Sequence, residues 1–406
     1  MNEQLLFERF ISQLSHWSKT GEVPRLGDCD IRKYLELQNR RIEEKGLKRT
    51  YDYTISGKIY KVGDSIVGQI VNGYNKRLNY SLGTKTVTYE RNGKIIYKEK
   101  KEVPFYQLLK WPEEDRGDWK KDTYVCDNCG NVETIEKLEE TGCPYCGTHF
   151  TVSEMYPKVA NFYTLDTVAD TKMSFGRFCK IALANIFFAL FITLCAFLGE
   201  TGVAGEYSFA TFYAVAYLVC LPLSMMFSPL VSGMVESIPV SLGVAGAKAK
   251  ITSKLKKYDP SFSYDYFEGK ALSLLRMMIF EKDVTQSVQY RGGALKSAYA
   301  DIVDMDYRGG LDVSKIEENG NYIEVTLRVL MKNTYYSKKR CKKKKDTMYL
   351  RMRHDTTWKV LPDFSIVKVM CHGCGGSFDA TKQRNCPYCQ AEYNVGRDDW
   401  EVLEVL

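Results

Sequence analysis

Eight of the 13 cysteines in this chain fall into four C-x-x-C pairs, a spacing that is typical of metal-binding proteins. A C-x-x-C turn brings two thiolates to one point, and two such turns complete a tetrahedral zinc shell. Two structural Zn²⁺ sites are therefore predicted. The ligands are Cys126, Cys129, Cys143 and Cys146 in the first site, and Cys371, Cys374, Cys386 and Cys389 in the second.

Disulfides and a redox C-x-x-C motif are the alternatives to zinc. Redox motifs occur singly, not as two matched quartets, and disulfides require an oxidising compartment. His149 and His372 lie next to the cysteines, but both quartets already supply four thiolates. No position is left open for water, so a catalytic role for the metal is not expected.

The elements around the quartets repeat. Leu6, Phe10, Leu14 and Trp17 form a helical stripe, and Asp30 is expected to cap a helix over Ile31–Lys45 that ends at Gly46. Strands are expected at Thr84–Glu90 and Ile95–Lys98, joined by an Asn92-Gly93 turn. Later, Ile323–Met331 alternates apolar and polar residues, as a half-buried strand does. Each half is expected to contain helices, then strands, then a zinc ribbon.

Two long uncharged runs, Ile181–Gly199 and Tyr207–Val235, separate the halves. Their lengths match a bilayer core of about 30 Å, and they are interpreted as a transmembrane hairpin of two helices. Lysine and arginine flank the pair, whereas the loop between the runs has none, so both termini are expected in the cytoplasm. The predicted location is therefore a cell membrane, with a multi-pass topology. For Ser237–Ala247 the alternatives are an interfacial helix, a re-entrant stretch and a connector.

The segment from Tyr258 to Met370 resembles the domain of the mitochondrial import subunit Tim-forty-four and its bacterial relatives. The residues that carry the resemblance are Asp259–Phe262, Tyr266–Ala271 and Leu350–Trp358. The full arrangement also looks like bacterial zinc-ribbon membrane proteins of the transport class, which implies that the membrane is a bacterial cell membrane. This resemblance implies a nuclear-transport-factor-two-like cone fold, which is a curved sheet wrapped by helices around a pocket.

The chain of 406 residues is 45% hydrophobic and 13% aromatic, which excludes a disordered or fibrous protein. The predicted class is α+β, with two cytoplasmic modules that each carry a four-cysteine zinc ribbon and are separated by the hairpin. The expected parts are an N-terminal module at 1–122, ribbon 1 at 123–155, the hairpin at 178–235, a basic connector at 236–257, the Tim-forty-four-like domain at 258–370 and ribbon 2 at 371–400.

A basic run at Lys338–Lys345 holds seven cations in eight residues between two expected strands. Anionic lipid is the favoured partner, since cations near an acidic membrane surface contribute about 1 kcal/mol each. A solvated loop is the plain alternative, and nucleic acid is the least favoured partner. The predicted lipid-binding residues are Lys338, Lys339, Arg340, Lys342, Lys343, Lys344 and Lys345.

No sequence motif of an enzyme is present. The chain has only four histidines and lacks the G-x-S-x-G, P-loop, G-x-G-x-x-G and H-E-x-x-H patterns. The sequence therefore predicts a non-enzymatic, membrane-anchored adaptor or transport-associated protein that tethers an unidentified protein partner. A small-molecule or lipid sensor that uses the cone pocket, and a membrane-tethered nucleic-acid binder, are the alternatives.

Overall fold

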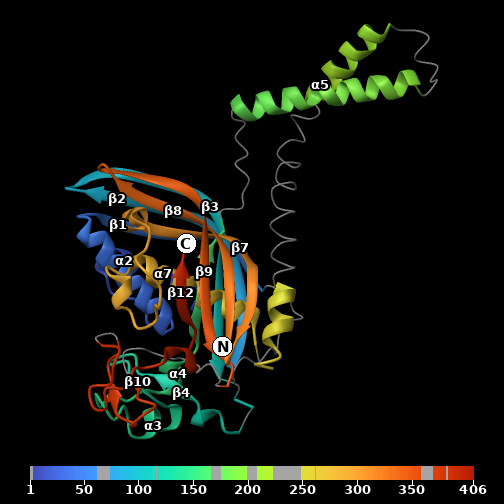
Figure 1. Cartoon of the computed structure of the whole chain (residues 1–406). Coiled ribbons are helices and arrows are strands. Elements are labelled where there is room, and N and C mark those ends of the chain that lie inside the picture. The colour runs from blue at the N-terminus through green and yellow to red at the C-terminus, as the bar shows by residue number, and fades with distance from the viewer. Residues whose placement is uncertain are drawn as a thin grey trace. The chain divides into compact units, whose positions relative to one another are not determined.

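A computed structural model describes residues 3–61, 74–112, 114–115, 117–165, 175–198, 208–222, 248–260, 262–357, 369–380 and 383–406. The chain divides into two compact units (Figure 1). We call the unit formed by residues 1–166 and 243–406 the main unit. The unit formed by residues 167–242 is the helical unit.

The first half of the main unit, residues 3–165, is a helical pair followed by a four-stranded antiparallel sheet. A zinc-ribbon-like segment is inserted between the third and fourth strands, and the strand order is β1-β2-β3-β6. The elements are α1 (Glu3–Thr20), α2 (Cys29–Glu44), β1 (Lys48–Lys61), β2 (Tyr74–Arg91), β3 (Lys94–Pro112), β4 (Thr123–Val125), β5 (Val132–Thr134), α3 (Ile135–Glu140), α4 (Val152–Met155) and β6 (Lys158–Thr164).

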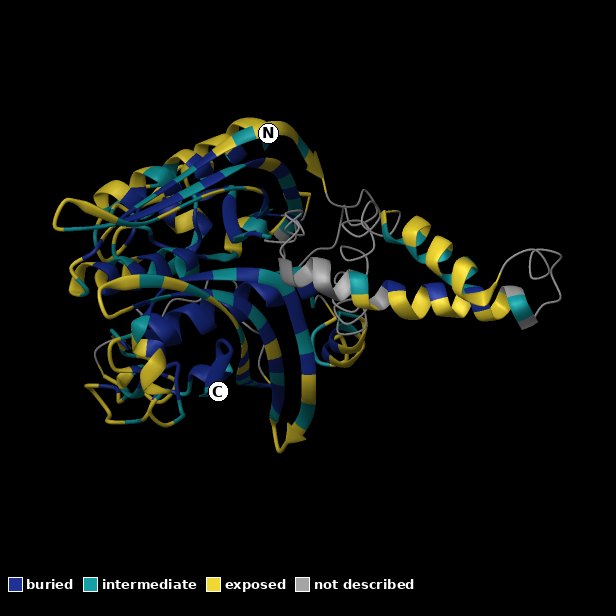
Figure 2. Ribbon diagram, turned by 90° about the horizontal axis from the view of Figure 1, so that it is seen from above, coloured by how far each residue is buried: buried dark blue, intermediate teal, exposed yellow. Residues whose placement is uncertain are grey.

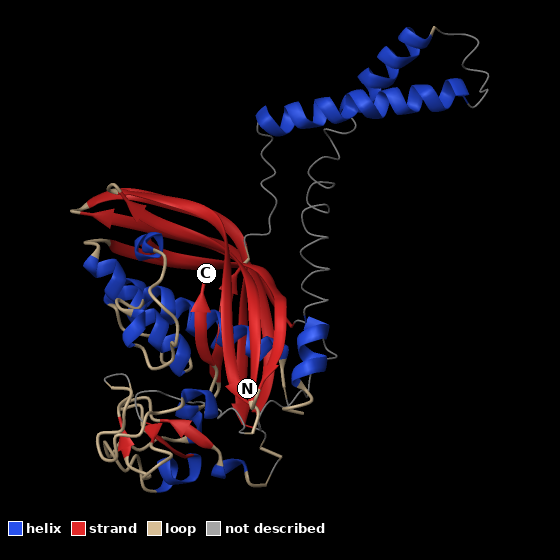
Figure 3. Ribbon diagram, in the orientation of Figure 1, coloured by secondary structure: helices blue, strands red, loops and turns tan. Residues whose placement is uncertain are grey.

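The second half, residues 248–406, repeats this order. A helix over 248–255 precedes α7, and the strand order β12-β9-β8-β7 again joins the third strand to the fourth across a cysteine-rich insertion. The main elements are α7 (Tyr264–Phe280), β7 (Ile302–Asn319), β8 (Tyr322–Ser337), β9 (Arg340–Asp355), β10 (Val369–Met370), β11 (Ser377–Phe378) and β12 (Glu401–Val405). Figure 3 shows the two curved sheets and the helices that they cover.

Several local expectations are confirmed, and one is corrected. Asn92 and Gly93 form the tight turn between β2 and β3, with φ of 50° and 74°. The alternating residues of β8 are buried on one face as expected. The cap of α2, however, is Asp28 and not Asp30, because the Asp28 carboxylate accepts a hydrogen bond from the backbone N–H of Ile31 at 3.0 Å. Asp30 lies inside the first turn.

The two halves share one hydrophobic core, which corrects the expectation of two separate modules. One cluster of buried residues runs from α1 and β3 through α7 to β8 and β9. Phe105 of β3 packs against Phe7 and Phe10 of α1 with ring centroids 5.6 and 6.5 Å apart, and α2 packs on α7. In Figure 2 the exposed residues of the main unit lie mainly on turns and outer faces.

A ladder of tyrosines also joins the halves. Tyr60, Tyr80, Tyr106 and Tyr163 are direct cross-strand neighbours on β1, β2, β3 and β6. Their successive ring centroids lie 5.3, 5.4 and 5.1 Å apart. Tyr163 then meets the edge of Tyr307 on β7 at 5.3 Å, so the ladder crosses the junction of the two sheets.

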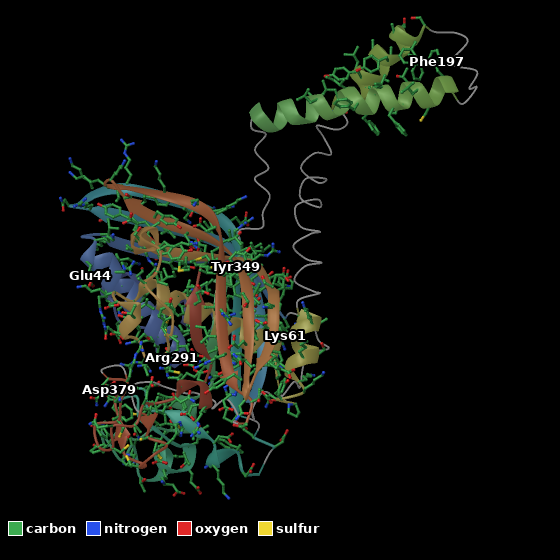
Figure 4. All side chains as sticks on the ribbon, in the orientation of Figure 1. Glu44, Lys61, Phe197, Arg291, Tyr349 and Asp379 are labelled. Atoms are coloured by element: carbon green, nitrogen blue, oxygen red, sulfur yellow. The ribbon has the colours of Figure 1, made fainter. Side chains whose placement is uncertain are left out.

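The helical unit contains α5 (Phe175–Leu198) and a helix over 209–222, which pack together through Phe197 and Phe209 with ring centroids 5.2 Å apart (Figure 4). In the described part of the chain, no helix combines the length and the apolar character needed to cross a membrane. The predicted transmembrane hairpin at 178–235 and the multi-pass location in a bacterial cell membrane are therefore wrong. An apolar composition does not by itself distinguish a helix that spans a bilayer from an apolar helix that packs on a neighbouring helix, as α5 does through Phe197 and Phe209.

Parts of three further expectations lie outside the described residues. These are the connector Ser237–Ala247, the C-terminal part of the second apolar run and residues 358–368 of the Tim-forty-four-like domain expected at 258–370. The last two residues of that expected domain form β10, which pairs with β11 inside the second cysteine-rich segment.

Candidate metal centres

Four tight turns of the same kind hold the eight cysteines. The cysteine that opens each turn accepts a hydrogen bond at its carbonyl from the N–H four residues later, at 2.8 to 2.9 Å. The residue at that later position is left-handed each time, with φ between 62° and 74°, and it is Gly130, Gly147, Gly375 or Gln390. Glycine adopts this conformation without strain, whereas Gln390 does not.

Each quartet brings its four sulfur atoms together. The Sγ atoms of Cys126 and Cys146 lie 3.6 Å apart, as do those of Cys129 and Cys143. The Cys371–Cys389 and Cys374–Cys386 pairs have the same separation, and all ligand atoms of a quartet lie within 4.8 Å of one another. A disulfide would require about 2.05 Å. A tetrahedron with metal–sulfur bonds of about 2.3 Å has edges of about 3.8 Å, so both quartets fit a four-coordinate metal ion.

The electrostatics of the quartets also favour a cation. The Thr148 hydroxyl lowers the pKa of Cys146 to about 6, and the N–H groups of Cys374 and Gly373 lower the pKa of Cys371 to about 7. Burial instead raises the pKa of Cys126 to about 11. The protein thus lowers the pKa of one cysteine in each quartet, and a divalent ion would add positive charge that favours thiolates.

The two neighbouring histidines are held by other contacts. His372 stacks on Tyr393 with the ring centroids 5.3 Å apart, and its Nε2 lies 3.1 Å from an Asp398 carboxylate oxygen. The ring of His149 packs over Gly142. Among the described residues, neither histidine belongs to a group that can hold a metal.

Charged side chains fix the first cysteine segment to the helices. Asp127 lies inside the first C-x-x-C turn, where its carboxylate contacts Arg32 of α2 at 2.5 Å and Lys158 of β6 at 2.7 Å. Tyr124 donates to the same carboxylate at 3.0 Å. The metal centre is therefore coupled to α2 and to the fourth strand of the sheet.

The second cysteine segment is attached in a different way. Arg384 donates to the carbonyls of Ser287 and Tyr290 at 3.0 and 3.1 Å. Arg291, labelled in Figure 4, contacts Glu392 within the segment and pairs with Glu401 of β12 at 2.9 Å, and Val288 packs into the apolar core of the segment. In both segments, therefore, an arginine links the cysteine turns to the shared core.

The predicted lipid-binding run turns out to be a hairpin rather than a loop. Lys338 and Lys339 form a two-residue turn with φ of 51° and 62°, and Arg340 already begins β9. Lys343 points inward, where it contacts Glu99 and lies 2.9 Å from Asp306. The other six cations are exposed, namely Lys338, Lys339, Arg340, Lys342, Lys344 and Lys345.

Sequence reasoning predicted the corresponding hairpin of the first half but missed its exposed cations. The β2–β3 hairpin occupies the same place in the repeat as the β8–β9 hairpin, and its exposed cations are Lys94, Lys98 and Lys100. The signal that could have found them is the repeat itself, because aligning the two meanders places both basic turns at equivalent positions.

Two hollows of the main unit differ in size and lining. A cavity of ≈ 50 Å³ lies at the junction of the halves, which is room for a few water-sized molecules and far below the roughly 300 Å³ of a typical small-molecule pocket. A cleft of ≈ 290 Å³ lies between the N-terminal part of α2 and the first metal centre and includes Cys29, Arg32 and Asp127.

Comparisons with known proteins do not identify a family for this chain. No protein-family model, no curated protein and no solved structure matches it. The function must therefore be inferred from the geometry described above.

Proposed function

We propose that this protein is a non-catalytic adaptor that docks peripherally on an anionic lipid surface through two basic hairpins. The two hairpins are β2–β3 and β8–β9, and two structural Zn²⁺ ions stabilise the cysteine-rich segments of the same unit. The observation that carries this proposal is the convergence of nine exposed cations, three from the first hairpin and six from the second.

The two hairpins lie side by side near their turns. Glu99 of β3 contacts Lys343 of β9, and the guanidinium of Arg91 at the end of β2 lies 5.7 Å from the ring centroid of Tyr336 on β8. In Figure 1 the ends of β2 and β8 reach the same edge of the main unit. The inward Lys343 fixes the hairpins, which leaves the neighbouring cations for an external partner.

The chemistry of this surface favours lipid over nucleic acid. Ile95, next to the β2–β3 turn, is 59% exposed and is flanked by Lys94, which combines an apolar tip with cations as interfacial segments do. Single-stranded nucleic acid is usually bound by exposed aromatic rings on which bases stack. The nearby rings are engaged instead: Tyr335 donates to Asp346 at 2.7 Å, and Tyr97 packs on Tyr89.

The expected binding free energy is sufficient for reversible docking on an anionic membrane surface. Each cation near an acidic membrane surface contributes about 1 kcal/mol, so nine cations support binding even if half of them engage. Salt screens these contacts over about 8 Å at physiological ionic strength, so binding should fall steeply as salt is raised.

Zinc is the metal that we propose for the quartets. Four thiolates in a tetrahedral arrangement suit zinc or iron–sulfur chemistry, and closed shells of four cysteines on paired C-x-x-C turns are typical of structural zinc. Elemental analysis of the purified full chain should find two zinc atoms per chain, and finding iron or one metal per chain would contradict the assignment.

Vesicle sedimentation tests the lipid proposal. The full chain should bind vesicles that contain about 30% phosphatidylserine and not vesicles of phosphatidylcholine alone. A variant with Lys338, Lys339 and Lys342 changed to Gln should bind more than tenfold more weakly, on about 1 kcal/mol per cation. The matched control changes Lys254, Lys256 and Lys257, which are also exposed, and should bind like the wild type. Equal weakening in the control, or salt-sensitive binding to duplex DNA that exceeds vesicle binding, would overturn the proposal.

A further inference from the structure

The cavity at the junction of the two halves is lined by charged and polar groups from both halves. Its walls come from α1, α2, β1, β2 and β6 on one side and from α7 and β7 on the other. Trp17, Arg49 and Arg276 all line it, and each is more than 90% buried. Groups of this kind seldom line an interior hollow without a polar occupant.

The charges around the cavity leave one positive charge in excess. Arg49 pairs with Asp304 at 3.4 Å. Asp306 contacts both Lys85 and Lys343, and Lys343 also contacts Glu99. Among the side chains that line the cavity, Arg49 and Lys85 therefore pair with the two carboxylates, Asp304 and Asp306. Arg276 is the third cation of the lining, and within the described part of the chain it has no carboxylate partner.

Among the described residues, the side chain of Arg276 contacts one polar partner, the aromatic residue Tyr34. Its guanidinium donates to the Tyr34 hydroxyl at 3.3 Å and lies 5.0 Å from the centroid of the same ring. A buried cation without a counter-charge is costly, since its desolvation is not offset. Arg41 makes a useful contrast, because its equally buried guanidinium donates to the carbonyls of Ile279 and Ala300 at 2.9 and 3.0 Å.

Two further donors line the cavity and have no acceptor among the described residues. They are the indole Nε1–H of Trp17 and the Nε–H of Arg49. The guanidinium of Arg49 lies 4.4 Å from the centroid of the Trp17 ring, so the two donors come from adjacent side chains. An acceptor of negative charge would satisfy both donors and would neutralise Arg276.

We propose that this cavity binds a small monovalent inorganic anion, with chloride as the abundant candidate. Arg276 supplies the unbalanced charge, and Trp17 and Arg49 supply the directed N–H groups. Water can accept from these donors, but it cannot neutralise the excess charge. The volume of ≈ 50 Å³ admits chloride and excludes phosphate esters and metabolites.

The position of the site gives the anion a structural consequence. Trp17 belongs to α1 and Arg49 to β1, whereas Arg276 belongs to α7. An anion bound to all three links the first half to the second, and a ligand that binds only the folded state raises stability with its concentration. The association of the halves should therefore depend on chloride.

Thermal unfolding of the full chain tests this proposal at constant ionic strength. Replacing gluconate by chloride should raise the melting temperature of the wild type in proportion to the logarithm of chloride concentration above the dissociation constant. The Arg276→Met variant should lose this dependence. The Arg41→Met variant is the matched control and should keep it, although it loses stability.

A second measurement uses the folded wild-type protein and is independent of variant folding. Chloride NMR line broadening should titrate to one site per chain, and Trp17→Phe should weaken the affinity about fivefold through the loss of one hydrogen bond. A melting temperature independent of chloride, no line broadening, or chloride dependence that persists in Arg276→Met would show that the cavity holds only water and would overturn the proposal.

Discussion

Among the four consecutive lysines Lys342–Lys345, the inward-facing Lys343 is expected to affect the stability of the fold, whereas its exposed neighbours are expected to affect surface binding. The side chain of Lys343 is only 9% exposed and bridges Asp306 and Glu99, whereas that of Lys344 is 72% exposed. Removing one partner of a buried ion pair typically costs about 3–5 kcal/mol. Asp306 would keep its contact with Lys85, so we expect Lys343→Met to cost about 3 kcal/mol, the lower end of that range.

Urea unfolding monitored by circular dichroism measures this difference. Lys344→Met is the control: it breaks only an exposed pair with Asp346 at 3.1 Å and should cost less than about 1 kcal/mol. At about 2 °C per kcal/mol for a unit of this size, Lys343→Met should lower the melting temperature by about 6 °C. Equal losses in the two variants would refute the inward pairing of Lys343.

The stability contributed by the ion pair of Asp306 and Lys343 should change with pH in a defined direction. Burial acts to raise the pKa of Asp306, but Lys85 and Lys343 hold this pKa well below the ordinary value of 3.8. A lowered carboxylate pKa contributes stability above the ordinary value, and this contribution is lost as the pH falls below it. The stability difference between the wild type and Lys343→Met should therefore shrink below about pH 4.

Three further predictions concern the interior and the metal centres. Burial raises the pKa of Glu268 to about 7, so its stabilising contribution is complete below pH 4.5 and is lost as the pH rises through 7. Glu268→Gln, which can still accept from Tyr307, should remove this pH dependence of the unfolding free energy measured with urea. Gln390→Gly should raise the unfolding free energy by about 1 kcal/mol by relieving a left-handed backbone at φ of 62°, and no gain would argue against that geometry. A strong chelator should unfold the cysteine-rich segments, seen as lost protection from hydrogen exchange, while unchanged protection would contradict a structural metal.

The cysteine quartets could be predicted from the sequence because their ligands are local. A C-x-x-C turn needs only its own backbone and a residue such as Gly130 that tolerates positive φ, so spacing determines the geometry. The burial of one face of β8 could be predicted for the same reason, since alternation is a property of the strand itself.

The arrangement of the halves could not be predicted, because it depends on contacts distant in sequence. Nothing near Lys343 shows that Asp306 and Glu99 will lie against it, and the composition of the Lys338–Lys345 run suggests that all seven cations are equivalent. The transmembrane prediction for the apolar run at 207–235 failed for a related reason, since apolar composition alone does not distinguish a bilayer-spanning helix from one that packs on a neighbouring helix. The Asp28 cap was missed because Asp28 and Asp30 are equally good caps by residue type.

The binding of the β2–β3 hairpin variant to anionic vesicles tests the central proposal most directly, because only the folded arrangement brings this hairpin beside the basic run. Changing Lys94, Lys98 and Lys100 to Gln should weaken binding by a factor similar to that of the triple change in the β8–β9 hairpin, more than tenfold at about 1 kcal/mol per cation. Unchanged binding by this variant would contradict a surface shared by the two hairpins.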